Sequence, residues 1–219
     1  MKKIWSRLFF SAVAVMMVVY LTCDIFSIWD SRPLKFVTSA VITLFGLTVL
    51  HKKESRFVSV GLLFTLFADV FLVLLNKYLY GVAVFIVAQL CYAVYLTYIS
   101  DKKVTCELLK RIIPAVMAAA ITAALGFKGN IVLPAAYAVC IGVNIAHSVE
   151  LQLKKPCNKH LLLMIGFIIF VCGDICVGLR HLPFVTENVA AVLYLITWVS
   201  YPPSQILVLA STGAFECKD

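Results

Sequence analysis

Eight long apolar stretches dominate the chain and decide what it can fold into. Short polar connections such as DSRP (30–33) and KKPCNK (154–159) separate them. A helix needs roughly 20 mostly apolar residues to cross the hydrocarbon core of a bilayer, and it satisfies its backbone hydrogen bonds internally, as hydrocarbon demands. The stretches do not alternate apolar and polar residues, as the strands of a membrane barrel do. We therefore predict eight transmembrane helices, at 8–28, 34–50, 57–75, 78–100, 111–127, 131–149, 160–179 and 188–210.

The composition indicates the same class of protein. The chain is 63% hydrophobic and 14% charged, whereas soluble domains average about 45–50% apolar and about 25% charged residues. A soluble monomer of 219 residues could not cover so many apolar side chains. No small-x-small cleavage site follows the first stretch, so we interpret it as an uncleaved helix and not as a signal peptide. We expect residues 1–219 to form one all-α domain, a polytopic membrane bundle of eight helices.

The basic residues are distributed unevenly around these stretches. Of the 19 Lys and Arg residues, 14 lie at the two termini or in the connections after the second, fourth and sixth stretches, and five lie on the other side. Cytoplasmic loops of membrane proteins carry an excess of Lys and Arg. The distribution predicts a multi-pass protein of the cell (plasma) membrane with both termini in the cytoplasm. The net charge of +8 then reflects topology, so we expect no nucleic-acid partner.

Two segments of the chain resemble each other. GLLFTLFAD (61–69) and GFIIFVCGD (166–174) both begin with Gly and end with Asp eight residues later. They lie four helices apart, and an even number of crossings keeps the direction, so both helices run outward from the cytoplasm. This predicts a possible parallel four-plus-four internal repeat, with its axis along the membrane normal.

The aspartates of these segments, Asp69 and Asp174, are the strongest candidates for function. Ionisable residues within a span are costly and usually face a cavity or a partner. Both lie roughly 8–9 Å below the outer end of their helix, at about 1.5 Å rise per residue. Asp24 and Glu150, in contrast, lie at helix ends, where we expect them to reach water. A close buried pair of carboxyls holds one proton between them, which suits acid–base hydrolysis of a lipid, proton-coupled transport or a structural hydrogen bond.

Uncharged polar residues within the stretches form a second group of candidates. Such residues often hydrogen-bond to neighbouring helices, but they can also line a binding pocket. No HExxH, GxSxG or Walker motif occurs, and the histidines are scattered, so we expect no metal and no cofactor. The candidates for substrate binding are Gln89, Tyr92, Asn144, His147, Tyr201 and Gln205.

Short motifs occur in order along most of the chain. They are Arg32-Pro33-Leu34, Ala68-Asp69, Gly81 to Phe85, Gln89 to Tyr92, Gly173-Asp174 and Tyr201 to Gln205. These motifs resemble those of the YhhN-like family, which includes the lysoplasmalogenases. Two positions depart from the family pattern: Ala68 replaces the usual Gly before the first Asp, and Gln89 replaces the usual His.

The resemblance implies a hydrolase that cleaves the vinyl ether bond of a lysoplasmalogen into a fatty aldehyde and a glycerophospho-headgroup. Protonation of the β-carbon gives an oxocarbenium ion, to which water adds. Asp69 and Asp174 would be the acid–base pair, without metal or cofactor, and the partners would be a lysophospholipid substrate and membrane lipid. A proton-coupled transporter of a small solute or lipid is the alternative. Gln89 also leaves open an inactive family member.

Overall fold

The computed structural model describes residues 2–50, 53–182 and 184–215, with the backbone alone for residues 2 and 3. The described residues form eight α-helices and one π-helical turn, so the predicted all-α class is confirmed. These elements are α1 (Lys2–Phe26), α2 (Arg32–Val49), α3 (Arg56–Asp69), η1 (Val70–Leu74), α4 (Tyr78–Ile99), α5 (Val104–Ala124), α6 (Gly129–Lys154), α7 (Asn158–Arg180) and α8 (Glu187–Ser211).

Seven of the helices among the described residues are long and apolar enough to cross a membrane. The exception is α5, which has 21 residues and carries three charged ones in its first half, Glu107, Lys110 and Arg111. The predicted span begins at about residue 111, and the helix itself extends further, because α5 begins at Val104. Glu107 and Arg111 lie one turn apart, form an ion pair of 3.2 Å and are both buried. Their mutual pairing lets two charges that indicated a connection lie inside a helix.

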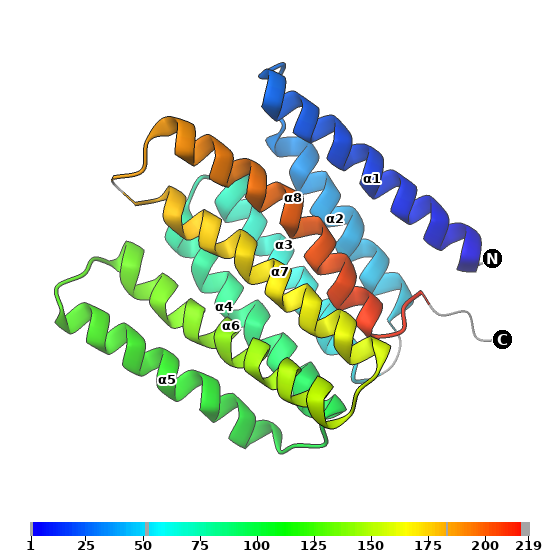
Figure 1. Cartoon of the computed structure of the whole chain (residues 1–219), viewed down its shortest axis with the longest axis vertical. Coiled ribbons are helices and arrows are strands. Elements are labelled where there is room, and N and C mark those ends of the chain that lie inside the picture. The colour runs from blue at the N-terminus through cyan, green and yellow to red at the C-terminus, as the bar shows by residue number, and fades with distance from the viewer. Residues whose placement is uncertain (1, 51–52, 183, 216–219) are drawn as a thin grey trace.

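The helices are arranged with α1 and α5 at opposite edges of the bundle (Figure 1). Consecutive helices pack together, and α8 also contacts α1 and α2, while α4 also contacts α5 and α6. A shift of four helices converts the α2–α8 contact into α6–α4, and the α1–α8 contact into α5–α4. Most of these contacts follow a four-plus-four pattern, but α8 also contacts α3 without a matching contact between α4 and α7 among the described residues. The repeat itself stays a prediction.

The glycines that begin the two similar segments occupy tight helix contacts. A Cβ atom on Gly61 would lie 2.4 Å from the ring of Tyr92 in α4, and one on Gly166 would lie 3.1 Å from the backbone nitrogen of Val208 in α8. Each glycine thus lets its helix approach the next one along the chain.

Helix α8 continues through Pro202 and Pro203. A proline removes the backbone donor that would bond to the carbonyl four residues earlier. For Pro202 that carbonyl belongs to Trp198, and it accepts a hydrogen bond of 2.8 Å from the hydroxyl of Tyr20 in α1. The bond satisfies the freed carbonyl and fixes α1 to the part of α8 that carries Trp198 and Tyr201.

The π-helical turn η1 directly follows Asp69. Within it the Leu75 amide donates to the Val70 carbonyl, five residues earlier, over 2.9 Å. Such turns occur mostly as single interruptions of α-helices and are frequent at functional sites. Here the turn changes the helical register immediately after Asp69, and it brings Leu72 and Val73 into the wall of a cavity.

Candidate functional site

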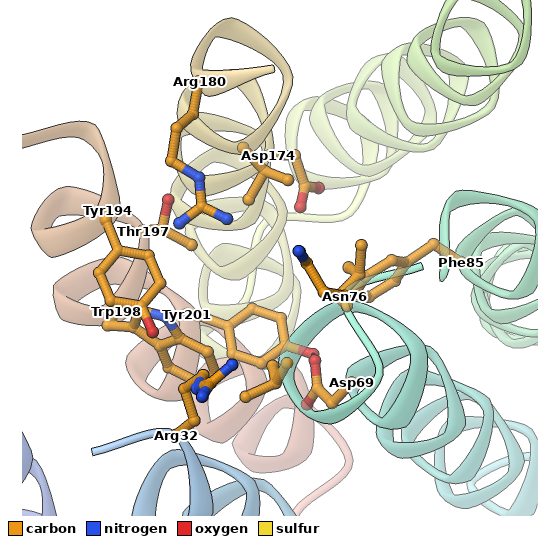
Figure 2. Close-up of a pocket in the computed structure, with 13 residues that line it drawn as sticks. Arg32, Asp69, Asn76, Phe85, Asp174, Arg180, Tyr194, Thr197, Trp198 and Tyr201 are labelled. Carbon is orange, nitrogen blue, oxygen red and sulfur yellow. The ribbon is translucent and has the colours of Figure 1, made fainter. Parts of the chain in front are cut away.

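A cavity of about 240 Å³ lies at the end of the bundle opposite to the start of α1 and the end of α8. Its walls come from α2, α3, η1, α4, α7 and α8. Asp69 and Asp174 both line it, from opposite sides (Figure 2). The structure therefore brings the two aspartates of the similar segments to one shared space.

Asp69 is almost completely buried, with 2% of its surface exposed. Its Oδ1 atom accepts a hydrogen bond of 2.8 Å from the hydroxyl of Tyr201. Its other oxygen, Oδ2, makes no hydrogen bond to any of the described residues. One oxygen of the carboxyl group is thus held by Tyr201, and the other is buried without a hydrogen-bond partner among the described residues.

Asp174 is partly exposed to the cavity, and its Oδ2 atom accepts a hydrogen bond from the hydroxyl of Tyr137 in α6. This bond ends a chain of side chains that begins at Arg111. The Nε atom of Arg111 donates to Asn144 over 2.7 Å, and Asn144 donates to the side-chain oxygen of Gln89 over 2.9 Å. Gln89 in turn donates to the Tyr137 hydroxyl over 3.3 Å.

The direction of every bond in this chain follows from Arg111, because a guanidinium group has donors and no acceptor. Asn144 must present its oxygen to Arg111 and its NH₂ group to Gln89. Gln89 then accepts with its oxygen and donates its NH₂ group to the Tyr137 hydroxyl, which donates to Asp174. All donors therefore point from a buried cation toward the carboxyl group of Asp174. Such an arrangement stabilises a negative charge at its end.

Arg111 is completely buried, and its remaining donors are also used. Nη1 donates to the backbone and side-chain oxygens of Glu107, over 2.6 and 3.2 Å. Nη2 lies 2.9 Å from Nδ1 of His147, and this ring nitrogen must be the acceptor because arginine has only donors. The ring proton of His147 therefore lies on Nε2, which is 3.0 Å from the Ser100 hydroxyl. The cation is thus held in one position at the predicted cytoplasmic half of the bundle.

Four of the six residues predicted to bind substrate occupy three different places. Tyr201 lines the cavity with the two aspartates. Gln89 and Asn144 lie behind it and reach Asp174 only through Tyr137. His147 is one step further away, against Arg111.

Two further predicted residues are buried in the bundle and do not line the described cavity. Tyr92 packs against Gly61, and its hydroxyl lies 3.2 Å from that of Thr65. Gln205 lies one helical turn beyond Tyr201 on α8, and both of its amide atoms lack hydrogen bonds within the described part of the chain.

The sequence reasoning missed several residues that the cavity needs. Tyr137 lies seven residues before Asn144, so the two share a face of α6, and this spacing could have indicated a joint role. Arg180 lies at the predicted outer end of a span, where basic residues are disfavoured, and it lines the cavity. Asn76, also in the wall, has a φ of 51°, a left-handed conformation that Asn adopts more readily than most residues.

Asp24, which we expected to reach water, is instead paired inside the bundle. Its Oδ2 atom lies 2.5 Å from Nζ of Lys35, which is completely buried. The ammonium group of Lys35 also lies 3.8 Å from the centre of the Tyr194 ring, in the geometry of a cation–π contact. The expectation was wrong because the basic partner lies at a helix start, eleven residues later in the chain. The pair supports the cavity wall at Tyr194.

Comparison with known proteins places this architecture in a family. A model of the YhhN family matches residues 31–212, from the start of α2 to just past the end of α8. The chain belongs to the YhhN family. The predicted resemblance is confirmed. The matched residues include the two aspartates, their partners Tyr137 and Tyr201, and the hydrogen-bonded side chains that begin at Arg111. No curated protein and no solved structure matches the chain significantly. Membership of the YhhN family supports chemistry of the lysoplasmalogenase type at the level of the family.

Proposed function

We propose that the protein is a membrane lipid hydrolase that cleaves the vinyl ether bond of a lysoplasmalogen, releasing a fatty aldehyde and a glycerophospho-headgroup. The observation that carries the proposal is that Asp69 and Asp174 line one cavity and each accepts a hydrogen bond from a tyrosine. Membership of the YhhN family supports the same reaction class.

The surroundings of the two aspartates suggest different roles. Two carboxyl groups in one cavity of low polarity resist double ionisation, so one of them retains a proton. Asp174 ends the chain of donors from Arg111, which favours its carboxylate form. Asp69 accepts one hydrogen bond at Oδ1 and none at its buried Oδ2, so burial disfavours its carboxylate form more. We therefore assign the acid to Asp69 and the base to Asp174.

The reaction then proceeds with balanced proton transfers. Asp69 gives its proton to the β-carbon of the vinyl ether, and Asp174 stabilises the oxocarbenium ion that forms. Water adds to the carbon that bears the ether oxygen and gives a proton to Asp174. The resulting hemiacetal collapses as Asp69 takes the hydroxyl proton and Asp174 protonates the departing glycerol oxygen. Both aspartates return to their starting forms, and one water molecule is consumed.

Gln89 fits an active enzyme, although the family usually has His at this position. It accepts a hydrogen bond from Asn144 and donates one to Tyr137. A neutral imidazole also offers one acceptor and one donor. The substitution therefore preserves the link to Asp174, which favours an active protein over an inactive family member.

Substitution of each aspartate tests the proposal in purified protein. We expect Asp69→Asn and Asp174→Asn each to lower aldehyde release from a lysoplasmalogen by about 100-fold or more, the usual contribution of a general acid or base. The matched control is Asp101→Asn, because Asp101 is exposed, lies outside the cavity and has a left-handed backbone that Asn accepts. Full activity in both cavity variants would refute the proposal. Solute or lipid uptake that depends on the aspartates, without aldehyde release, would favour the transporter.

A further inference from the structure

The mouth of the cavity carries two arginines. Arg32 begins α2 and Arg180 ends α7, and both line the cavity that contains the aspartates. Arg32 is half exposed and pairs with Asp30 over 2.8 Å. Arg180 is partly buried and has no ion pair among the described residues; its guanidinium carbon lies 4.7 Å from the centre of the Tyr194 ring. Figure 2 shows this group pointing into the cavity between Tyr194 and Asp174.

A partly desolvated guanidinium without an acidic partner is a suitable site for an anion. Arginine presents a planar fork of donors that matches the oxygens of a phosphate group, and charged hydrogen bonds of this kind are roughly twice as strong as neutral ones. The carboxyl groups of Asp69 and Asp174 lie deeper in the same cavity. The anionic part of a ligand therefore belongs at the mouth, near Arg180, and a neutral part belongs at the aspartates.

A second cavity, of about 170 Å³, adjoins the first at Asp174 and Phe85, which line both. Its walls come from η1, α4, α6 and α7 and are mostly apolar. One wall residue, Ile175, is 54% exposed on the outside of the bundle. This cavity thus lies against the surface that faces lipid, and it offers space for a hydrocarbon chain.

We propose that the two cavities together bind one amphiphile, with its phosphate group at Arg180 and Arg32 and its hydrocarbon chain in the apolar cavity between α4, α6 and α7. The inference rests on the proposed function in one respect, which is that the bond placed at Asp174 is the vinyl ether bond. With the predicted orientation, the mouth opens on the outer side, so the substrate enters from the outer leaflet.

The dimensions of the site agree with this placement. Asp174 and Arg180 lie six residues apart on α7, which is about 9 Å along the helix axis. In a lysoplasmalogen, seven bonds separate the phosphorus atom from the β-carbon of the vinyl ether, and by the reach of an extended chain they span about 8 Å. A phosphate at Arg180 therefore places the reacting carbon at the depth of Asp174.

A binding measurement tests the phosphate end without relying on catalysis. The probe is radiolabelled lysophosphatidylcholine, an ester without a vinyl ether, with full-length protein in nanodiscs. We expect Arg180→Gln to weaken its binding about 10- to 100-fold, the effect of losing a charged hydrogen bond, and Arg180→Lys to restore part of it. Lys77→Gln is the matched control, because Lys77 is exposed at the same end of the bundle and does not line the cavity. Monoacylglycerol of equal chain length should bind Arg180→Gln and the parent protein alike.

The apolar end is tested by filling the second cavity. A Cβ atom on Gly178, which lines this cavity, meets no atom within 4 Å, so the backbone accepts a side chain there. We expect Gly178→Leu to weaken binding of a long-chain lysolipid more than that of a short-chain one. Gly142 also has open space at its Cβ position but lines neither cavity, so Gly142→Leu should bind normally.

The outcomes separate this inference from the proposed reaction. Unchanged binding in Arg180→Gln, an equal loss of monoacylglycerol binding, or competition by inorganic phosphate as strong as that by lysolipid would overturn the inference. If binding follows the expected pattern but no aldehyde is released from a lysoplasmalogen, the amphiphile site stands and the reaction fails. If aldehyde is released but Arg180→Gln leaves KM unchanged, the reaction stands and the phosphate site fails.

Discussion

Individual polar residues in this bundle are either fully paired or distinctly unpaired, and the unpaired ones indicate where to test function. Arg111 uses its donors on Glu107, Asn144 and His147. The amide of Gln205 is also buried but makes no hydrogen bond to a described residue. A buried unpaired polar group costs stability, so its presence in the core calls for an explanation.

Replacement of Gln205 by Leu should therefore separate stability from activity. We expect Gln205→Leu to stabilise the protein by about 1 kcal/mol, because it removes an unpaired amide. We also expect it to reduce aldehyde release, because Gln205 lies one helical turn beyond Tyr201, the hydrogen-bond partner of Asp69. Thermal unfolding in detergent and the aldehyde assay measure the two effects. In contrast, Gln152→Leu removes an amide that bonds to the Cys157 backbone over 3.3 Å and should lower Tm. A lower Tm with unchanged activity in Gln205→Leu would show that the amide has only a structural role.

The two aspartates could be predicted from the sequence, because a carboxyl group inside a long apolar stretch is costly and therefore conspicuous. Tyr137 and Arg180 could not be identified in the same way. A tyrosine is common in membrane helices, and an arginine at a helix end is ordinarily solvated. The role of Tyr137 depends on its contact with Asp174, 37 positions away, and the role of Arg180 depends on the shape of the cavity.

At the scale of elements, α4, α5 and α6 form a support for the end of α7. The chain from Arg111 crosses from α5 to α6, α4, α6 again and then α7. Gln89 is the link from α4. Because it acts through Tyr137, we regard it as a positioning residue.

Two substitutions of Gln89 test this link. Gln89→His keeps one donor and one acceptor and should retain activity. Gln89→Leu removes the donor to Tyr137 and the side-chain acceptor of Asn144, whose amide keeps its bond of 2.9 Å to the backbone carbonyl of residue 89. We expect Gln89→Leu to lower kcat about 10-fold, in the range seen when a supporting hydrogen bond is lost, with little change in KM. A normal kcat in Gln89→Leu would show that the chain does not act on Asp174.

The helices themselves follow from the apolar stretches, but two local features do not. Helix α5 begins before the predicted span, because the Glu107–Arg111 pair neutralises and buries two charges. The turn η1 was not predicted, because it depends on packing between elements. A Cβ atom on Gly81 would lie 2.4 Å from Leu72, so the glycine in α4 provides the space that η1 occupies.

For the whole molecule, the sequence predicts the depth of each aspartate but not which helices enclose the cavity. That depends on contacts such as α2 with α8 and α4 with α6, which join distant parts of the chain. The residues that line the cavity include Arg32 at the start of α2 and Arg180 at the end of α7. These helix ends lie opposite to the start of α1 and the end of α8 (Figure 1), so the predicted cytoplasmic termini place the cavity outside.

Cysteine labelling tests this orientation. Cys106, in the first turn of α5, and Cys157, in the connection before α7, are exposed on the predicted cytoplasmic side. With the other cysteines replaced, we expect a membrane-impermeant maleimide to label them only in permeabilised cells, and to label Lys77→Cys in intact cells. The reverse pattern would place the cavity on the cytoplasmic side.

The most direct test of the central claim, that a carboxylic acid in this cavity protonates the β-carbon of a vinyl ether, is the reaction in deuterated water. Aldehyde trapped by immediate reduction should carry one deuterium on the carbon next to the former aldehyde carbon. The saturated alkyl ether lysolipid should give no aldehyde, because it has no double bond to protonate. Aldehyde without deuterium at that carbon, or deuterated aldehyde formed at the full rate by Asp69→Asn, would contradict the mechanism.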